Sequence, residues 1–334
     1  MKRTRTSLAA AAVLTVLLSL AACGGDDAGG SDGIELTLAH SYTEDQPQHT
    51  CGAEVIKEET ESADVGLSVE IYPASQLGGD ADRIASVQSG DVDIDIQGAS
   101  ALAAAYDPVG VIDAAYAFDD AEHLQRFFDS GAADQLKKDF KAESDVTILG
   151  AWSAGAREFT ANKPIREPAD LDGVRMRFPG SPQFLLNAKA LGAEATEVAY
   201  EELYLGLQQG VVDAQENPLT NIQASNLVEV QDYLSMSDHA LNSNLIIAAP
   251  TYDDLNDEQQ KALDDAVAAA VEKMPGCVED AEQEILDGWE SEDAIDIVDD
   301  VDKKAFAKQT DAWFRKNLEG DSLKVYEDIK GSAK

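Results

Sequence analysis

Residues 65–96 read VGLSVEIYPASQLGGDADRIASVQSGDVDIDI and carry the pattern that decides the fold. Residues 65–72 form a strand-like segment that stops at Pro73, and residues 80–89 form a helix-like segment that stops at Gly90. Apolar and acidic residues then alternate with period two over residues 92–96, which indicates a further strand. Strands separated by helices predict an α/β fold with a mainly parallel sheet and helices on both of its faces.

The same alternation extends in both directions along the chain. Residues 49–62 form another helix-like segment, and further strand-like segments cover residues 34–39, 146–149, 174–178 and 239–249. With 334 residues, of which 44% are apolar, the chain is long enough for about two domains with separate cores. We therefore expect two such sheets.

One helix-like segment is unusually long. Apolar residues recur every three or four positions over residues 258–290, which predicts a helix of roughly 50 Å at 1.5 Å per residue. A helix of that length exceeds the diameter of one small domain, so we expect it to lie across both halves of the protein. The alternative is a pair of helices that is broken at Pro275.

The composition disfavours several classes of function. Acidic residues number 64 against 25 basic ones, a formal net charge of −39, and no basic cluster is available to bind nucleic acid. The four histidines lack the spacing of a metal site, and no phosphate-cradling or dinucleotide-binding glycine pattern occurs. We expect no cofactor, no metal and no enzymatic activity.

The N-terminal residues predict export. Lys2, Arg3 and Arg5 precede an apolar run that is too short to span a membrane, so residues 1–22 are predicted to be a signal peptide. The run ends in LAAC, which resembles a bacterial lipobox with Cys23 as the lipidated residue, and residues 24–33 would form a flexible tether. The alternative is a plain signal peptide with an incidental cysteine.

Two further cysteines are present, Cys51 and Cys277. Export would place them where disulfides persist, and they are too few for a structural zinc site. A disulfide between them is the favoured interpretation, and two buried thiols are the alternative.

An ordered set of motifs closely resembles the substrate-binding proteins of TRAP transporters, the DctP-like family of tripartite ATP-independent periplasmic transporters. The motifs are YPASQLGG (72–79), WSAGAREFT (152–160), LDGVRMRFP (171–179), LGA (191–193), ELY (202–204), LQQG (207–210) and VDAQENP (212–218). They occur in order and at matching spacing over nearly the whole chain that follows the signal peptide.

This resemblance implies a two-lobed periplasmic-binding-protein fold with crossover strands and a long helix that braces both lobes. We expect residues 34–154 and 243–282 in the first lobe and residues 155–242 and 283–334 in the second. The resemblance also implies an organic-acid ligand in the cleft between the lobes, hinge closure, and delivery to a sodium-coupled TRAP permease by a monomer. The protein would be anchored to the outer face of the cell membrane by the lipid on Cys23.

The resemblance also assigns the ligand-binding residues. It places the carboxylate-binding arginine at Arg177 and further pocket positions at Arg157, Tyr200, Asn217, Asp80 and Ser41, the last beside His40. Sialic-acid-binding members carry a glutamate where this chain has Gly98, and this departure from the family pattern argues against sialic acid as the ligand. A tethered input domain for a membrane sensor kinase, or an exported hydrolase, would be alternative functions.

Physical chemistry supports Arg177 independently. Arg175 and Arg177 lie two residues apart on a predicted strand and should share one of its faces. A guanidinium presents a planar pair of donors that meets a carboxylate in a bidentate manner, which lysine cannot copy. The alternative is that both arginines pair with the abundant surface carboxylates.

Overall fold

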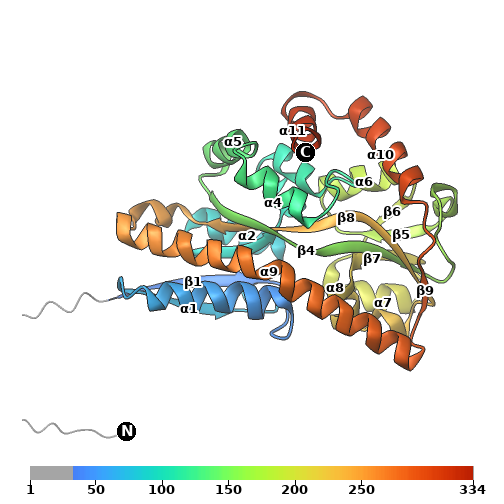
Figure 1. The fold of residues 1–334 in the computed structure, drawn as a ribbon, viewed down its shortest axis with the longest axis horizontal. Helices are drawn as coiled ribbons and strands as arrows, with labels where there is room; N and C mark the ends of the chain where they lie inside the picture. Colours follow the sequence, from blue (N-terminus) through green and yellow to red (C-terminus); the bar gives the residue numbers. More distant parts are fainter. Residues whose placement is uncertain (1–32, 334) are drawn as a thin grey trace, which may run out of the picture. The chain divides into compact units, whose positions relative to one another are not determined.

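The computed structural model describes residues 33–333, shown as a ribbon in Figure 1. The expected signal peptide at residues 1–22 and the expected lipidation site Cys23 lie outside the described residues. No helix within residues 33–333 is long and apolar enough to cross a membrane.

Nine strands form a single mixed sheet among the described residues. They are β1 (Ile34–His40), β2 (Leu67–Tyr72), β3 (Ile94–Gly98), β4 (Thr147–Ala161), β5 (Arg175–Phe178), β6 (Glu194–Glu197), β7 (Ala214–Pro218), β8 (Tyr233–Ala248) and β9 (Asp296–Val298). The strand order is β2-β1-β3-β8-β4-β7-β5-β6, and β9 pairs with β8.

The long strands β4 and β8 connect two parallel half-sheets. The N-terminal half-sheet, β2-β1-β3, is parallel throughout, and so is the C-terminal half-sheet, β7-β5-β6. β8 pairs antiparallel with β3, β4 pairs antiparallel with β7, and β4 and β8 pair with each other along most of their 15 and 16 residues. The expectation of two separate sheets is therefore wrong, because these two strands carry one hydrogen-bond ladder through both halves.

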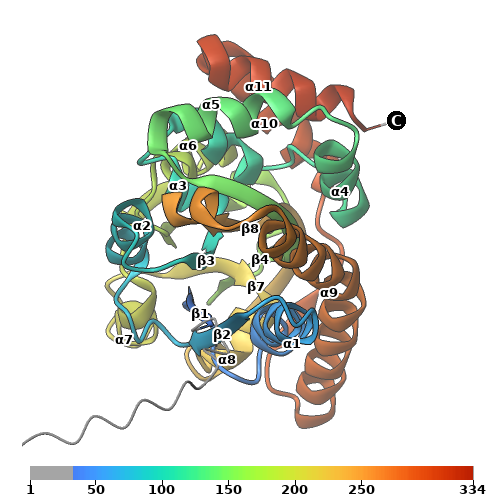
Figure 2. The same cartoon turned by 90° about the vertical axis from the view of Figure 1, so that its left-hand side faces the viewer.

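Helices cover both faces of this sheet. They are α1 (Glu54–Ser62), α2 (Asp80–Ser89), α3 (Ala99–Leu102), α4 (Ala121–Asp129), α5 (Asp134–Ser144), α6 (Pro182–Leu191), α7 (Leu203–Gln208), α8 (Leu219–Ala224), α9 (Asp257–Glu292), α10 (Lys303–Asn317) and α11 (Gly320–Gly331). A π-helical turn, η1 (Gln48–Ala53), leads into α1, and short 3₁₀ turns are η2 (Asp107–Asp113), η3 (Pro168–Leu171), η4 (Tyr200–Glu202), η5 (Leu227–Glu229) and η6 (Pro250–Asp254). In Figures 1 and 2, α4, α5 and α11 lie on one side of β4 and β8, and α1 and α8 lie on the other.

The long helix α9 is a single helix of 36 residues that continues through Pro275. Asn256 is the N-cap of α9, and its side-chain oxygen accepts hydrogen bonds from the backbone N–H groups of Glu258 and Gln259. Its first half contributes Leu263 to the core beneath β1 and β2, and its last turns contribute Trp289 to a separate core with α7 and α8. The helix therefore packs against both halves of the two-lobed fold, as its length predicts.

Cys51 in η1 and Cys277 in α9 are joined by a disulfide, the pairing that the sequence favours. The bond connects η1, which leads into α1, to the middle of the long helix α9. At the other end of the chain, α11 packs against η2 and α4, and the Ile329 carbonyl oxygen lies 2.9 Å from Nε2 of His123. These contacts join a segment expected in the second lobe to elements expected in the first, and the lobe boundaries stay a prediction.

Candidate functional site

A cavity of about 610 Å³ lies between the two half-sheets. Residues that follow β1 and end β3 line one wall, and residues of β5 and β7 line the other, so the carboxyl ends of parallel strands face the same space, as is usual in open α/β sheets. All six residues expected to bind the ligand line it, namely Ser41, Asp80, Arg157, Arg177, Tyr200 and Asn217. His40, expected next to them, is fully buried outside the lining.

Arg177 reaches the cavity from β5, and only 3% of the residue is exposed. Its Nε donates to the Val198 carbonyl oxygen at 2.8 Å, and within residues 33–333 its guanidinium has no carboxylate at ion-pair distance. Burial lowers the pKa of Arg177 to about 10, against the opposing charge of Glu216, so the group remains a cation at neutral pH. A buried cation without a protein counter-ion is suited to binding an anion.

Arg175, two residues earlier on the same strand, forms an ion pair at the protein surface and does not line the cavity. Its side chain is exposed and binds Asp213 with Nε at 2.9 Å and Nη2 at 2.5 Å from the two carboxylate oxygens. The surface pairing considered from sequence therefore applies to Arg175 and not to Arg177.

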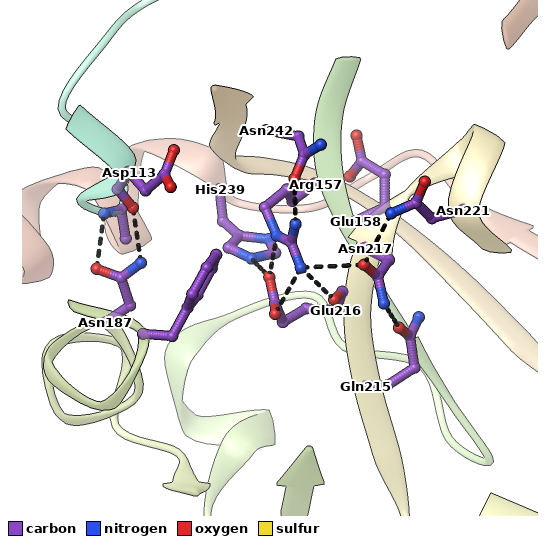
Figure 3. Close-up of polar contacts among 12 residues, drawn as sticks. Asp113, Arg157, Glu158, Asn187, Gln215, Glu216, Asn217, Asn221, His239 and Asn242 are labelled. Carbon is purple, nitrogen blue, oxygen red and sulfur yellow. Dashed lines mark hydrogen bonds and ion pairs between the residues drawn. The ribbon is translucent and has the colours of Figure 1, made fainter. Parts of the chain in front are cut away.

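Arg157 lies on β4 and is already surrounded by protein acceptors, as Figure 3 shows. Its Nε and Nη2 bind the two carboxylate oxygens of Glu216, and its Nη1 donates to the Asn242 side-chain oxygen at 2.5 Å. Nη2 also contacts the Asn217 side-chain oxygen at 3.1 Å, and the guanidinium carbon lies 4.7 Å from the ring centre of Phe184. These bonds leave one Nη1 hydrogen of Arg157 for a ligand.

The buried carboxylate of Glu216 is the counter-ion of Arg157. Burial alone would raise the pKa of Glu216, but the charge of Arg157 and a hydrogen bond from His239 outweigh it and hold that pKa below its usual range. Burial lowers the pKa of His239, so the ring is neutral, and its Nε2 lies 3.2 Å from the Glu216 carboxylate. The Arg157–Glu216 pair is thus ionised and internally neutral.

Asn217 and Tyr200 complete this wall of the cavity. The Asn217 side chain accepts from Arg157 and donates to the Gln215 side-chain oxygen at 2.6 Å, which fixes its orientation. The Tyr200 hydroxyl accepts from Ser225 at 2.8 Å, so its ring lines the cavity while its polar end is held by the protein.

The opposite wall carries the expected residues Asp80 and Ser41. Asp80 begins α2, and one of its oxygens accepts from the Ser41 hydroxyl at 3.0 Å and from Nη2 of Arg83 at 3.0 Å. Arg83 is fully buried and also binds the buried Asp95 through Nε at 3.1 Å. Asp95 in turn accepts from the side chain of Gln97, which lines the cavity.

Sequence reasoning missed several of these groups. Arg83 could have been found, because it lies three residues after Asp80 on a predicted helix, a spacing that brings side chains together. Glu216 and Asn242 could not, because they meet Arg157 only through pairing between strands that are distant in sequence.

Two lobes, crossover strands and a cavity in which, among residues 33–333, Arg177 is the lining arginine without a carboxylate at ion-pair distance are typical of a protein that binds a small solute. The chain belongs to the family of bacterial extracellular solute-binding proteins, family 7 (DctP), which matches residues 38–321.

Relatives and solved structures agree with this assignment. A solute-binding protein of Roseobacter denitrificans is 34% identical over 245 residues, which cover 73% of this chain and 75% of that protein. The 2,3-diketo-L-gulonate-binding periplasmic protein YiaO of Escherichia coli is 28% identical over 79% of this chain and 82% of its own length. A crystal structure of a TRAP periplasmic solute-binding protein from Roseobacter denitrificans with bound L-galactonate superposes with a TM-score of 0.81 at 30% identity, over 89% of this chain and 98% of that chain. A corresponding protein from Polaromonas, bound to D-erythronate, gives a TM-score of 0.80 at 26% identity over the same shares.

Proposed function

We propose that this protein is an extracytoplasmic receptor that binds an organic acid in the cavity and delivers it to a sodium-coupled TRAP permease. The observation that carries the proposal is the buried guanidinium of Arg177, which faces the cavity without a carboxylate partner among the described residues. A carboxylate that enters a closed cavity loses its water, and a bidentate bond to a fixed guanidinium compensates for that loss.

The relatives support the same class of ligand. The named ligands of similar proteins include 2,3-diketo-L-gulonate, L-galactonate and D-erythronate, each of which is a small acid. Arg157, Asn217 and Tyr200 would shape the same wall and contribute single hydrogen bonds or ring contact, because most of their polar atoms are bound by the protein.

Closure would occur by rotation of the two lobes about β4 and β8. Both strands lose regular pairing between Ser153 and Ala156 of β4, and Gly155 has a φ of +96° there, a conformation that glycine adopts without strain. A hinge of this kind requires a few residues that absorb a change in backbone angles.

The ligand can be found by mass spectrometry of the small molecule that is released when protein from its native host is denatured. Calorimetry of the purified protein with that acid, and with the aldonates named above, should show binding that the Arg177→Ala variant lacks. Unchanged binding by a folded Arg177→Ala variant would overturn the proposed anchor.

We also propose that the receptor is exported and held at the outer face of the cell membrane by a lipid on Cys23. Palmitate labelling of cells should mark the wild-type protein and fail to mark a Cys23→Ser variant. A labelled, membrane-bound Cys23→Ser protein would contradict the lipid anchor.

A further inference from the structure

Arg83 holds two carboxylates together beneath one wall of the cavity. Its side chain is fully buried, with Nε bound to Asp95, Nη2 bound to Asp80 and Nη1 donating to the Gly78 carbonyl oxygen at 2.9 Å. A planar guanidinium makes these bonds in fixed directions. The buried Arg83 therefore fixes the position of the Asp80 carboxylate from the protein side of the cavity wall.

The charges in this group do not cancel. One cation faces two carboxylates, and Asp95 is entirely buried, whereas the Asp80 side chain is 57% exposed at the cavity. Burial raises the pKa of Asp95 to about 6 against the opposing charge of Arg83, so Asp95 is mostly ionised at neutral pH. Asp80 is therefore the carboxylate of this group that a ligand in the cavity can reach.

Asp80 also has free acceptor capacity. Ser41 and Arg83 both bind Oδ1, and within residues 33–333 no donor lies at hydrogen-bond distance from Oδ2. An ionised carboxylate can only accept hydrogen bonds, so it attracts hydroxyl groups and repels a second carboxylate.

The other wall carries a buried cation, Arg177. Arg157 is neutralised by Glu216, which leaves Arg177 as the lining cation without a counter-ion among the described residues. Glu201, which also lines the cavity, acts on Arg177 through its charge. An acid anchored at Arg177 would extend from this buried cation toward the carboxylate of Asp80 on the opposite wall.

We propose that Asp80, held in position by the buried Arg83, makes this cavity selective for polyhydroxylated monocarboxylates over dicarboxylates. The inference rests on the proposed function, because it assumes that the carboxylate of the ligand binds at Arg177. Arg83 is then a positioning residue and Asp80 a specificity-determining one.

Matched acids test this selectivity. L-Galactonate and galactarate differ only at C6, where a hydroxymethyl group is replaced by a carboxylate, and D-erythronate and meso-tartrate differ in the same way at C4. Calorimetry at pH 7.5 should show the wild-type protein binding at least one aldonate at least tenfold more tightly than its dicarboxylate counterpart. The selectivity ratio is the Kd of the dicarboxylate divided by the Kd of the matching aldonate, and Asp80→Asn should reduce this ratio at least threefold. Asp91→Asn makes the same charge change on an exposed residue beyond the end of α2 and should leave the selectivity ratio unchanged.

Arg83→Lys keeps the buried charge but cannot bind Asp80 and Asp95 through two separate nitrogens. It should therefore weaken aldonate binding and also lower the selectivity ratio. If that variant does not fold, the exposed Asp80→Asn change carries the test. An unchanged ratio in Asp80→Asn, or a wild-type protein that binds the dicarboxylates as tightly as the aldonates, would overturn the selectivity.

The outcomes separate this inference from the proposed function. Tight binding of galactarate, meso-tartrate or succinate that disappears in Arg177→Ala would leave the organic-acid receptor standing and refute the selectivity. If no acid in the panel binds in a manner that depends on Arg177, both are refuted.

Discussion

The guanidinium of Arg157 is bound by the carboxylate of Glu216, with Nε 2.5 Å from Oε2 and Nη2 2.9 Å from Oε1. Both side chains are almost completely buried, so each satisfies the charge of the other inside the protein. Two arginines line the cavity, and among residues 33–333 Arg177 is the one without a carboxylate at ion-pair distance, so we expect an entering acid to bind there. This division of roles makes Arg157 part of the framework and Arg177 the anchor that we propose.

Neutralising Glu216 should destabilise the protein strongly. Glu216→Gln leaves the charge of Arg157 buried without a counter-ion, and removal of one partner from a buried ion pair costs about 3–5 kcal/mol. Denaturant unfolding at pH 7 measures the loss. Asp213→Asn is the matched control, because it removes a carboxylate from the exposed pair with Arg175, where about 1 kcal/mol or less is expected. Equal losses in the two variants would contradict the structural role of Glu216.

The affinity for the acid should depend on the shape of the cation at position 177. Arg177→Ala leaves a desolvated carboxylate unpaired, which costs about 2–5 kcal/mol, or roughly 30-fold to several-thousand-fold in Kd. Arg177→Lys keeps the charge but loses the second donor, so its Kd should lie between those of Arg177→Ala and the wild type. Arg175→Ala, which removes a surface pair, should bind like the wild type. Calorimetry with the identified acid decides this, and an Arg177→Ala protein that binds within threefold of wild type would refute the anchor.

Much of the fold could be predicted because its elements have clear local signals. Helix α2 begins and ends at the predicted residues, since Gly79 precedes it and Gly90 ends it in a left-handed conformation. The central strands were predicted too short, because residues 153–155 of β4 and Asp238 of β8 interrupt the apolar pattern with small or charged residues. Those interruptions mark the place where the two long strands pass from one half of the sheet to the other, and hydrogen bonding across them is a tertiary property.

The site was predictable as a set of positions but not as a set of partners. The motif pattern selected six residues that do line one cavity, although their binding of a ligand stays a prediction. Whether Arg157 or Arg177 is available to a ligand depends on Glu216, which stands next to Asn217 in sequence but faces Arg157 only because β7 pairs with β4. Local sequence carries no signal for that choice.

The disulfide should contribute measurably to stability. Cys51 and Cys277 are 226 residues apart, and closing so long a loop restricts the unfolded chain, which typically stabilises by about 2–5 kcal/mol. The Cys51→Ala/Cys277→Ala variant should unfold at lower denaturant concentration, and reduction of the wild-type protein should have the same effect. Two free thiols in the denatured, unreduced protein would show that the bond does not form.

Glu282 of α9 lies against the crossing point of β4. Its Oε1 occupies the space beside Gly155, where an added Cβ would lie 2.1 Å away. Burial, together with the charges of Asp238 and Glu279, raises the pKa of Glu282 to about 7. The folded protein therefore holds a proton at this carboxyl over a pH range in which the unfolded chain has already released it.

The sign of the effect on stability follows from this difference. Between an ordinary glutamate pKa near 4.5 and about 7, the folded state binds more protons than the unfolded state, so this group makes the protein less stable as pH rises through that range. Glu282→Gln removes the ionisation and should stabilise the protein at pH 8 by about 1–3 kcal/mol while leaving it nearly unchanged at pH 4.5. Urea unfolding of the wild type and the variant at both pH values measures this, with Glu284→Gln, an exposed glutamate on the same helix, as the control. A Glu282→Gln protein whose stability relative to wild type is the same at pH 4.5 and pH 8 would show that this carboxyl does not titrate in the manner that its burial implies.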